Sequence, residues 1–499
     1  MSKMWERILP RVHELADLDS ALRLLSWDQH VMMPAAASGG RARVMATLQA
    51  LAHQRLTDPE LGDLLSEAEA DETLTEDEKA SLRLLRRDQH KATRLPERLV
   101  REMAELEALA FQAWAEARPA NDFSILEPHL SRMVALKKEA ADAIGWESER
   151  YDALIDDFEP GTSTAEVEAL FEELVPSLKP VAEKILASSG ERPAFLSVHY
   201  DVETQRAFCE WLVEQMGFKH GEGRFDISPH PFTVHIGASD VRQTTRYEST
   251  TLLMSIRASM HETGHALYEQ GIPKELLGLP IGDILSLGIH ESQSRIWEIQ
   301  VGTGRPFLEF VLPQLKERFP GQLASLDPDE FYRGVNHPRR SLIRVQADEV
   351  TYNLHIALRF EIELALFRDE LSVADLPDAF DAAMEKYVGI RPDTQSDGVL
   401  QDMHWAVGAL GYFPTYSLGT LYAAALFEKA QDDLGGLDDE LRQGDTSRLL
   451  SWLRENIHIK ASRRSGKETA EEVIGGPLSP RPFLDHLKRK YSEIYDISF

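Results

Sequence analysis

The residues best suited to chemistry form a His-Glu-Thr-Gly-His sequence at positions 261–265. His261 and His265 are four positions apart, so on a helix both imidazoles project from one face, about one turn apart. That spacing suits two ligands of a tetrahedral zinc ion. Glu262 lies about 100° around the helix. From there it can act as a general base without being a ligand. The motif therefore predicts a metal-dependent hydrolase.

The motif is short, and chance would produce it in roughly 0.05 of chains with this histidine content. The ordinary alternative is a pair of surface histidines on an amphipathic helix. The preceding residues 251–260, Thr-Leu-Leu-Met-Ser-Ile-Arg-Ala-Ser-Met, are strongly apolar. This favours histidines that face the interior, where imidazoles need partners. We therefore favour the metal site.

A catalytic zinc needs a third protein ligand and an open position. The Gly and His of metzincins are absent, because Tyr and Gly stand three and six positions after His265. Ile284 stands where aminopeptidase-type gluzincins have a Glu. The best candidate is Glu291, 26 residues after His265. Two antiparallel helices joined by a loop would bring it over the histidines. Glu298 is the second choice, although an exposed helix position is its more ordinary role.

The elements that must position these residues are mainly helical. Apolar residues recur every three or four positions from Trp5 to Leu25. The same periodicity predicts helices over 44–70, 76–117, 126–145, 164–188, 202–217, 249–270, 283–301, 341–369, 373–388, 417–434 and 446–457.

One segment before the motif helix differs from the rest. Residues 231–247 are rich in Thr and Val and are interrupted at Gly237-Ala238-Ser239-Asp240, which predicts a short antiparallel hairpin. We find no fixed-period repeat, low-complexity tract or interdomain linker. Residues 1–499 are therefore expected to form a single catalytic unit.

Composition limits the classes of function. The chain has 83 Asp or Glu against 54 Lys or Arg, a formal charge of −29. This argues against nucleic acid or an anionic membrane as the main partner. The single cysteine, Cys209, excludes an intramolecular disulfide and a cysteine metal cluster. The N-terminus lacks a signal-peptide core, and no apolar stretch reaches the ~18 residues of a membrane span. We expect a cytoplasmic protein.

Further motifs make the sequence resemble the Taq-type metallocarboxypeptidases, also called thermostable carboxypeptidase 1. These motifs are His230-Pro231-Phe232, Asp240-Val241-Arg242-Gln243-Thr244, His290-Glu291-Ser292-Gln293, Ile343-Arg344-Val345-Gln346-Ala347-Asp348 and Gly398-Val399-Leu400-Gln401-Asp402-Met403-His404-Trp405. Their order and rough spacing match the family pattern. Trp27-Asp28-Gln29 and the late residues 452–458 extend the resemblance over nearly the whole chain.

The resemblance implies a fold and an activity. The fold would be mainly α, a two-lobed helical body like that of neurolysin and angiotensin-converting enzyme. It would have a deep central groove and a small antiparallel β element near the metal. The activity would be removal of single residues from peptide C-termini, with broad preference and poor cleavage of C-terminal proline. Zinc is the usual metal and cobalt often substitutes. The family is cytoplasmic and commonly dimeric, so a homodimer is expected.

The resemblance also assigns roles around the metal. His404 and Tyr416 are expected to face it and to donate hydrogen bonds to the oxyanion of the transition state. Arg344 is expected to bind the substrate's α-carboxylate, because a guanidinium binds a carboxylate through two parallel hydrogen bonds. Asp348 would orient Arg344 from one helical turn away. The alternative is a plain surface pair of these two residues.

Two further residues are candidates for substrate binding. His230 would line the groove near the hairpin edge, although a structural turn before Pro231 is nearly as plausible. Arg242 is a second candidate, with Arg246 beside it as another.

Two other functions remain open from the sequence. An oligopeptidase or dipeptidyl carboxypeptidase would use the same metal site and differ in how far the carboxylate anchor lies from it. A noncatalytic helical scaffold would use zinc structurally. Glu262 argues against the scaffold, because a structural zinc closes all four positions and no fourth ligand is evident.

Overall fold

The structure is a computed structural model that describes residues 2–237 and 239–499. Its α-helices are α1 (Lys3–Val31), α2 (Ser38–Leu56), α3 (Pro59–Glu69), α4 (Glu76–Arg94), α5 (Glu97–Ala120), α6 (Glu127–Ile144), α7 (Arg150–Ile155), α8 (Thr164–Ser188), α9 (Val202–Gln215), α10 (Leu252–Glu269), α11 (Leu287–Arg295), α12 (Arg305–Arg318), α13 (Pro320–Leu323), α14 (Pro328–Val335), α15 (Tyr352–Phe367), α16 (Leu376–Val388), α17 (Phe413–Leu434), α18 (Asp438–Arg442), α19 (Ser447–Asn456), α20 (Gly466–Ile474) and α21 (Arg481–Tyr495). The strands are β1 (Gly223–Ile227), β2 (Thr233–Gly237) and β3 (Asp240–Thr245). Three short helices used below are the 3-10 helices η3 (Ala194–Ser197) and η8 (Arg344–Gln346) and the π-helix η7 (Ile296–Val301).

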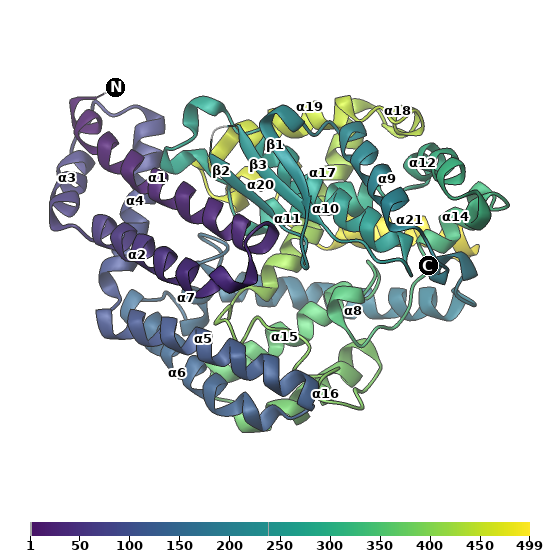
Figure 1. The fold of residues 1–499 in the computed structure, drawn as a ribbon, viewed down its shortest axis with the longest axis horizontal. Coiled ribbons are helices and arrows are strands. Elements are labelled where there is room, and N and C mark those ends of the chain that lie inside the picture. The colour runs from purple at the N-terminus through teal and green to yellow at the C-terminus, as the bar shows by residue number, and fades with distance from the viewer. Residues whose placement is uncertain (1, 238) are drawn as a thin grey trace.

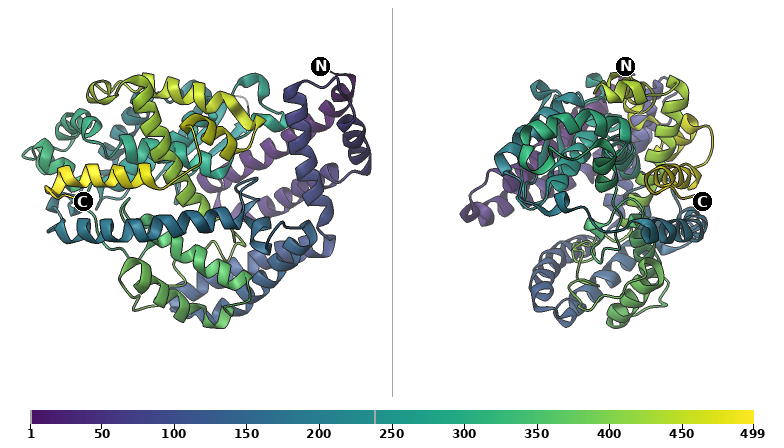
Figure 2. Two further views of the ribbon diagram at one scale, coloured as in Figure 1. Left: turned by 180° about the vertical axis from the view of Figure 1, so that it is seen from behind. Right: turned by 90° about the vertical axis from the view of Figure 1, so that its right-hand side faces the viewer.

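The helices gather into two lobes (Figures 1 and 2). One lobe holds the sheet, the motif helix α10, and α9, α11, α12 and α21, while α5, α6, α15 and α16 form the other (Figure 1). Helix α8 contacts α21 on one side and α15 on the other. The mainly helical, two-lobed prediction is confirmed. The deep groove between the lobes stays a prediction.

The small sheet has the strand order β1-β3-β2. The predicted hairpin is present, because β2 and β3 are antiparallel with Thr233 opposite Gln243. The prediction of a purely antiparallel element is wrong, since β1 pairs with β3 in parallel. Residues 223–227 carry no strong alternation that would have indicated β1. Ala238, at the predicted interruption, lies outside the described residues.

Several predicted helices end earlier than their periodicity suggested. The stretch 44–70 is divided before Pro59, and 76–117 is divided at Pro96, because proline lacks the N–H that continues a helix. The prediction of one helix over 341–369 is wrong, since its first turn is the 3-10 helix η8 and α15 begins at Tyr352. Asp348 explains the break, because its carboxylate accepts the backbone N–H groups of Val350 and Thr351.

The main hydrophobic core extends from Leu99 to Ile494 and includes buried side chains of both lobes. A second cluster, from Trp5 to Leu85, joins α1, α3 and α4. A core shared by both lobes is consistent with the single unit that we predict. Among the described residues, no helix combines the length and the apolar character needed to cross a membrane.

Candidate metal centre and active site

The two motif histidines lie on α10, which crosses α11 at very short range. A Cβ on Gly264 would stand 2.6 Å from the Cα of Ser294 and 2.7 Å from the carbonyl oxygen of Gln293. Only glycine fits between these backbones. The close crossing places Glu291, one turn before Ser294, over the face that carries His261 and His265.

The three predicted ligands come together as expected. His261 Nε2 lies 3.2 Å from His265 Nε2 and 3.4 Å from Glu291 Oε2, and His265 Nε2 lies 3.6 Å from the same oxygen. A tetrahedral zinc with bonds of about 2.0–2.1 Å separates its ligand atoms by about 3.3–3.5 Å. Two imidazole nitrogens and a carboxylate oxygen at these separations fit a small divalent cation.

Glu298 has neither of the roles considered from the sequence. It is not in the ligand cluster, and its side chain is only 14% exposed. Its Oε2 accepts a hydrogen bond from His261 Nδ1 at 2.9 Å. A carboxylate on the second nitrogen of a liganding histidine fixes the ring and its tautomer. Glu298 lies in η7, the last stretch of the predicted 283–301 helix, which adopts the π form from Ile296 onward.

Arg295 contacts this cluster, and the sequence analysis missed it. Its Nε donates to Glu291 Oε1 at 2.9 Å, and its Nη1 donates to Glu298 Oε2 at 3.3 Å. One guanidinium therefore holds both the third candidate ligand, Glu291, and the carboxylate behind His261. The signal was available, since Arg295 lies four positions after Glu291 and three before Glu298.

The electrostatics of the cluster distinguish the two histidines. Burial opposes a charged His261, but the carboxylates of Glu291 and Glu298 outweigh it and raise the pKa of His261 to about 9. Burial, together with His290 and His261, lowers the pKa of His265 well below its usual value. At neutral pH, His265 is ready to bind a cation, whereas His261 holds a proton.

Metal binding should therefore release a proton from His261. Below about pH 9 the protonated imidazole dominates, so the metal affinity should fall by about tenfold for each pH unit between pH 8 and 6. Calorimetric titration with zinc in buffers of different ionisation enthalpy measures the release, which we expect to be about one proton per ion at pH 7. An affinity that is constant over this range would contradict the pKa assigned to His261.

Helix α17 covers the other side of Glu291. A Cβ on Gly419 would lie 2.4 Å from Glu291 Cγ and 2.6 Å from its Cβ. Gly419 therefore lets α17 approach the third candidate ligand directly. Tyr416 lies one turn earlier on α17, at the same end of the cluster. Burial is the main cause that raises its pKa, and Glu291 is among the charges that add to the effect.

Replacing Gly419 with Ala should displace Glu291 and weaken metal binding by about tenfold or more, because a liganding carboxylate would move. The matched control is Gly40→Ala in α2, where an added Cβ meets nothing within 4 Å. Zinc competition against a chelating dye measures both affinities. Equal affinities for the two variants would contradict this packing.

His404 and Tyr416, the two predicted oxyanion donors, lie together. His404 Nε2 is 3.2 Å from the Tyr416 hydroxyl oxygen. Burial and the charge of Arg344 lower the pKa of His404 to about 4, so it is neutral at pH 7. When Nε2 carries the proton, His404 donates to Tyr416 and leaves the phenol hydrogen available for another acceptor.

Arg344 is held by a partner other than the predicted one. Its Nε and Nη2 both donate to Asp402 Oδ1, at 3.0 and 2.8 Å, and Asp348 does not contact its side chain. The predicted Arg344–Asp348 pairing is wrong because residues 341–351 do not form a helix. Arg359 also donates to Asp402. Two buried guanidiniums share one carboxylate, which leaves an excess positive charge beside Tyr416. The guanidinium carbon of Arg344 lies 4.9 Å from the centre of the Tyr416 ring.

The other two predicted substrate-binding residues lie in and next to the sheet. Arg242 makes two hydrogen bonds to Asp240, and its guanidinium carbon lies 4.2 Å from the centre of the Trp27 ring. These contacts join β3 to α1. His230 is exposed, and its carbonyl accepts a hydrogen bond from Ser228. Neither belongs to the ligand cluster, and their roles in substrate binding stay predictions.

Glu262, the predicted general base, is buried with 6% of its surface exposed. Burial, the largest influence, raises its pKa. Its Oε2 accepts a hydrogen bond from the hydroxyl of Thr233 at 2.8 Å. Thr233 is the second residue that the sequence analysis missed, and no local spacing connects these residues, which are 29 positions apart.

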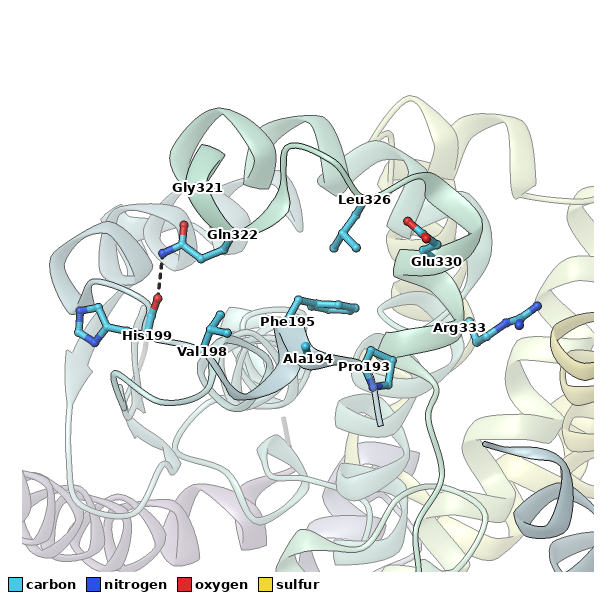
Figure 3. A pocket seen from close by; sticks show the side chains of 10 residues that line it. All are labelled: Pro193, Ala194, Phe195, Val198, His199, Gly321, Gln322, Leu326, Glu330 and Arg333. Atoms are coloured by element: carbon cyan, nitrogen blue, oxygen red, sulfur yellow. Dashed lines mark hydrogen bonds between the residues drawn. The ribbon is translucent and has the colours of Figure 1, made fainter. Parts of the chain in front are cut away.

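One cavity lies apart from these residues (Figure 3). It measures about 780 Å³ and lies between the segment that contains η3 and the helices α13 and α14. Its apolar lining includes Phe195, Val198 and Leu326. None of the predicted catalytic, metal-binding or substrate-binding residues borders it.

A His-Glu-x-x-His helix with a carboxylate from the next helix beside its two histidines defines the class, a helical metallopeptidase. The sequence model described as carboxypeptidase Taq (M32) metallopeptidase matches residues 7–491. The chain belongs to this family.

Relatives match along nearly the whole chain. It is 43% identical to thermostable carboxypeptidase 1 of Thermus thermophilus, over 98% of this chain and 99% of that protein. It is 38% identical to the Pyrococcus furiosus protein of the same name, over 97% and 98%. The crystal structure of the M32 carboxypeptidase from Deinococcus radiodurans superposes with a TM-score of 0.97 at 38% identity, covering 99% of this chain and 100% of that one.

Proposed function

We propose that the protein is a zinc metallocarboxypeptidase that releases single amino acids from peptides with a free C-terminus. The observation that carries the proposal is the cluster of His261, His265 and Glu291, with ligand atoms 3.2–3.6 Å apart and Glu262 on the same helix. The relatives support a carboxypeptidase over an oligopeptidase, because those named above are carboxypeptidases and match this chain over nearly their full length. Cobalt should substitute for zinc.

His261, His265 and Glu291 would hold the metal, which supplies Lewis acidity to the reacting water and carbonyl. Glu262 accepts a proton from the attacking water and delivers it to the nitrogen of the leaving amine. The His404–Tyr416 pair donates a hydrogen bond to the oxygen on which negative charge develops. Arg295 and Glu298 keep Glu291 and His261 in their orientations.

Arg344 is our anchor for the substrate's α-carboxylate. The support for this assignment is a charge imbalance: two arginines, Arg344 and Arg359, pair with the single carboxylate of Asp402. Of the two arginines, Arg344 is the one in contact with the ring of Tyr416. An anionic terminus reaching this region would neutralise that charge in a poorly solvated setting, where ion pairing is strong.

Replacing Arg344 with Gln should raise KM for peptides with a free C-terminus by about 10–100-fold, because a charge-assisted contact of about 1.5–3 kcal/mol is lost. The fold should survive, since Asp402 keeps Arg359 and the two charges then balance. Steady-state kinetics on a blocked dipeptide measures the change. An unchanged KM would place the carboxylate anchor elsewhere.

The function is tested with one peptide carrying either a free or an amidated C-terminus. Protein stripped with chelator is reloaded with zinc, cobalt or magnesium, and metal content is measured beside hydrolysis. We expect zinc and cobalt to restore cleavage of the free acid while the amide stays intact. Equal cleavage of both forms would indicate an endopeptidase. A metal-loaded but inactive protein would support the structural-zinc scaffold.

We further propose that the protein is a cytoplasmic homodimer and that residues 1–499 act as one unit. Family resemblance supports the dimer and the location, and the shared core supports the single unit. Sedimentation velocity should give twice the chain mass of 56.3 kDa. A monomer at micromolar concentration would contradict the dimer.

A further inference from the structure

The general base receives a hydrogen bond from a residue outside its own helix. Glu262 Oε2 accepts the hydroxyl hydrogen of Thr233, the first residue of β2. No other described residue donates to its side chain, and Oε1 is not among the atoms fully enclosed by protein. One carboxylate oxygen is therefore fastened to the sheet, and the other retains access to solvent.

The Thr233 hydroxyl has a choice of two acceptors. It lies 2.8 Å from Glu262 Oε2 and 3.0 Å from the backbone carbonyl oxygen of Glu262, but it carries a single hydrogen. A carboxylate is the stronger acceptor of the two, because charge-assisted hydrogen bonds are roughly twice as strong as neutral ones. The hydrogen therefore favours the carboxylate.

Thr233 itself is held firmly on β2. The residue before it, Phe232, donates its N–H to Thr244 Oγ1 and accepts the N–H of Thr244 through its carbonyl. The same sheet is also fastened to α10 on either side of Glu262, through hydrogen bonds from Ser259 to Thr245 and from Thr263 to Gln243. The donor is therefore in place before any substrate arrives.

We infer that Thr233 is a positioning residue for Glu262, holding its carboxylate so that Oε1 is directed to the reacting water. This inference rests on the proposed function. Without the hydroxyl, the carboxylate can rotate about its side-chain bonds, and a displaced base transfers protons poorly. Thr233 keeps its own hydrogen throughout, and the proton from the water goes to Glu262 Oε1. The effect should fall on kcat and leave KM and metal content unchanged.

The test compares Thr233→Val, which keeps the shape, with Thr233→Ser, which keeps the hydroxyl. In zinc-loaded protein we expect the valine variant to lose about 10–100-fold in kcat and the serine variant to stay within about 3-fold. Thr47→Val is the control, because it makes the same change at an exposed position of α2, where the hydroxyl donates only to the Arg43 carbonyl of its own helix. Its kcat should match the wild type, whatever its melting temperature.

A double-mutant cycle separates positioning from a general structural effect. In a Glu262→Ala background, Thr233→Val should change the residual rate by less than about 2-fold, because no carboxylate remains to position. The inference would be overturned if Thr233→Val caused the same fold-loss in the Glu262→Ala background as in the wild type. A wild-type kcat in Thr233→Val alone would also overturn it. If zinc-loaded wild-type protein released no amino acid from the peptide, the proposed function would fail instead, so the two failures are distinguishable.

Discussion

Replacing Glu262 with Gln should lower kcat by about 10²–10⁴-fold while the protein keeps its metal. Glutamine preserves the shape and can still accept the hydrogen of Thr233 through its side-chain oxygen, but it cannot take a proton from water. Because Glu262 is not in the ligand cluster, zinc content and zinc affinity should be unchanged. Steady-state kinetics and elemental analysis on the same samples measure both quantities.

The matched control for this variant is Glu275→Gln, an exposed carboxylate in the short 3-10 helix after α10. It should retain the wild-type rate. If Glu262→Gln lost its zinc, the activity loss would reflect the metal site, and the role of general base would need another residue. A rate near that of the wild type would remove Glu262 from the chemistry altogether.

Replacing Asp402 with Asn should destabilise the protein by about 3–5 kcal/mol, the cost of breaking a buried ion pair. Asp402 is the shared partner of Arg344 and Arg359, whose side chains are 5% and 1% exposed. Burial opposes its charged form, but the two guanidiniums outweigh it and hold the pKa of Asp402 well below its usual range. The neutral amide would leave both guanidiniums without a counter-charge.

Chemical denaturation measures this effect, with Asp393→Asn as the control on the same loop, where the carboxylate is exposed. The control variant should unfold at the same denaturant concentration as the wild type. Activity at a temperature where Asp402→Asn remains folded should also fall, since His404 lies two residues along the chain. A variant as stable as the wild type would mean that the two arginines find other compensation.

The metal ligands could be predicted because helical geometry relates them locally. Four positions separate His261 and His265, and the next helix offered Glu291 as its best-placed carboxylate. Arg295 was equally readable from its spacing to Glu291. The two-lobed helical architecture followed from periodicity together with the resemblance, and the hairpin followed from its Thr- and Val-rich composition.

The partners that support the site could not be predicted because they lie far apart in the chain. Arg344 pairs with Asp402, 58 residues away, and Thr233 binds Glu262, 29 residues away. No periodicity encodes such pairs. The pairing predicted for Arg344 failed for a local reason, since Asp348 binds the backbone ahead of α15 and interrupts the helical pattern.

The most direct test of the account is a time course on peptides of mixed sequence, followed by mass spectrometry, with samples lacking metal, reloaded with zinc and treated with chelator. We expect a ladder of fragments that keep the N-terminus and become shorter by one C-terminal residue at a time. The ladder should stop at proline and should form only when metal is present. Loss of dipeptides or internal cuts in the metal-loaded sample would contradict the account and would place the carboxylate anchor farther from the metal than Arg344.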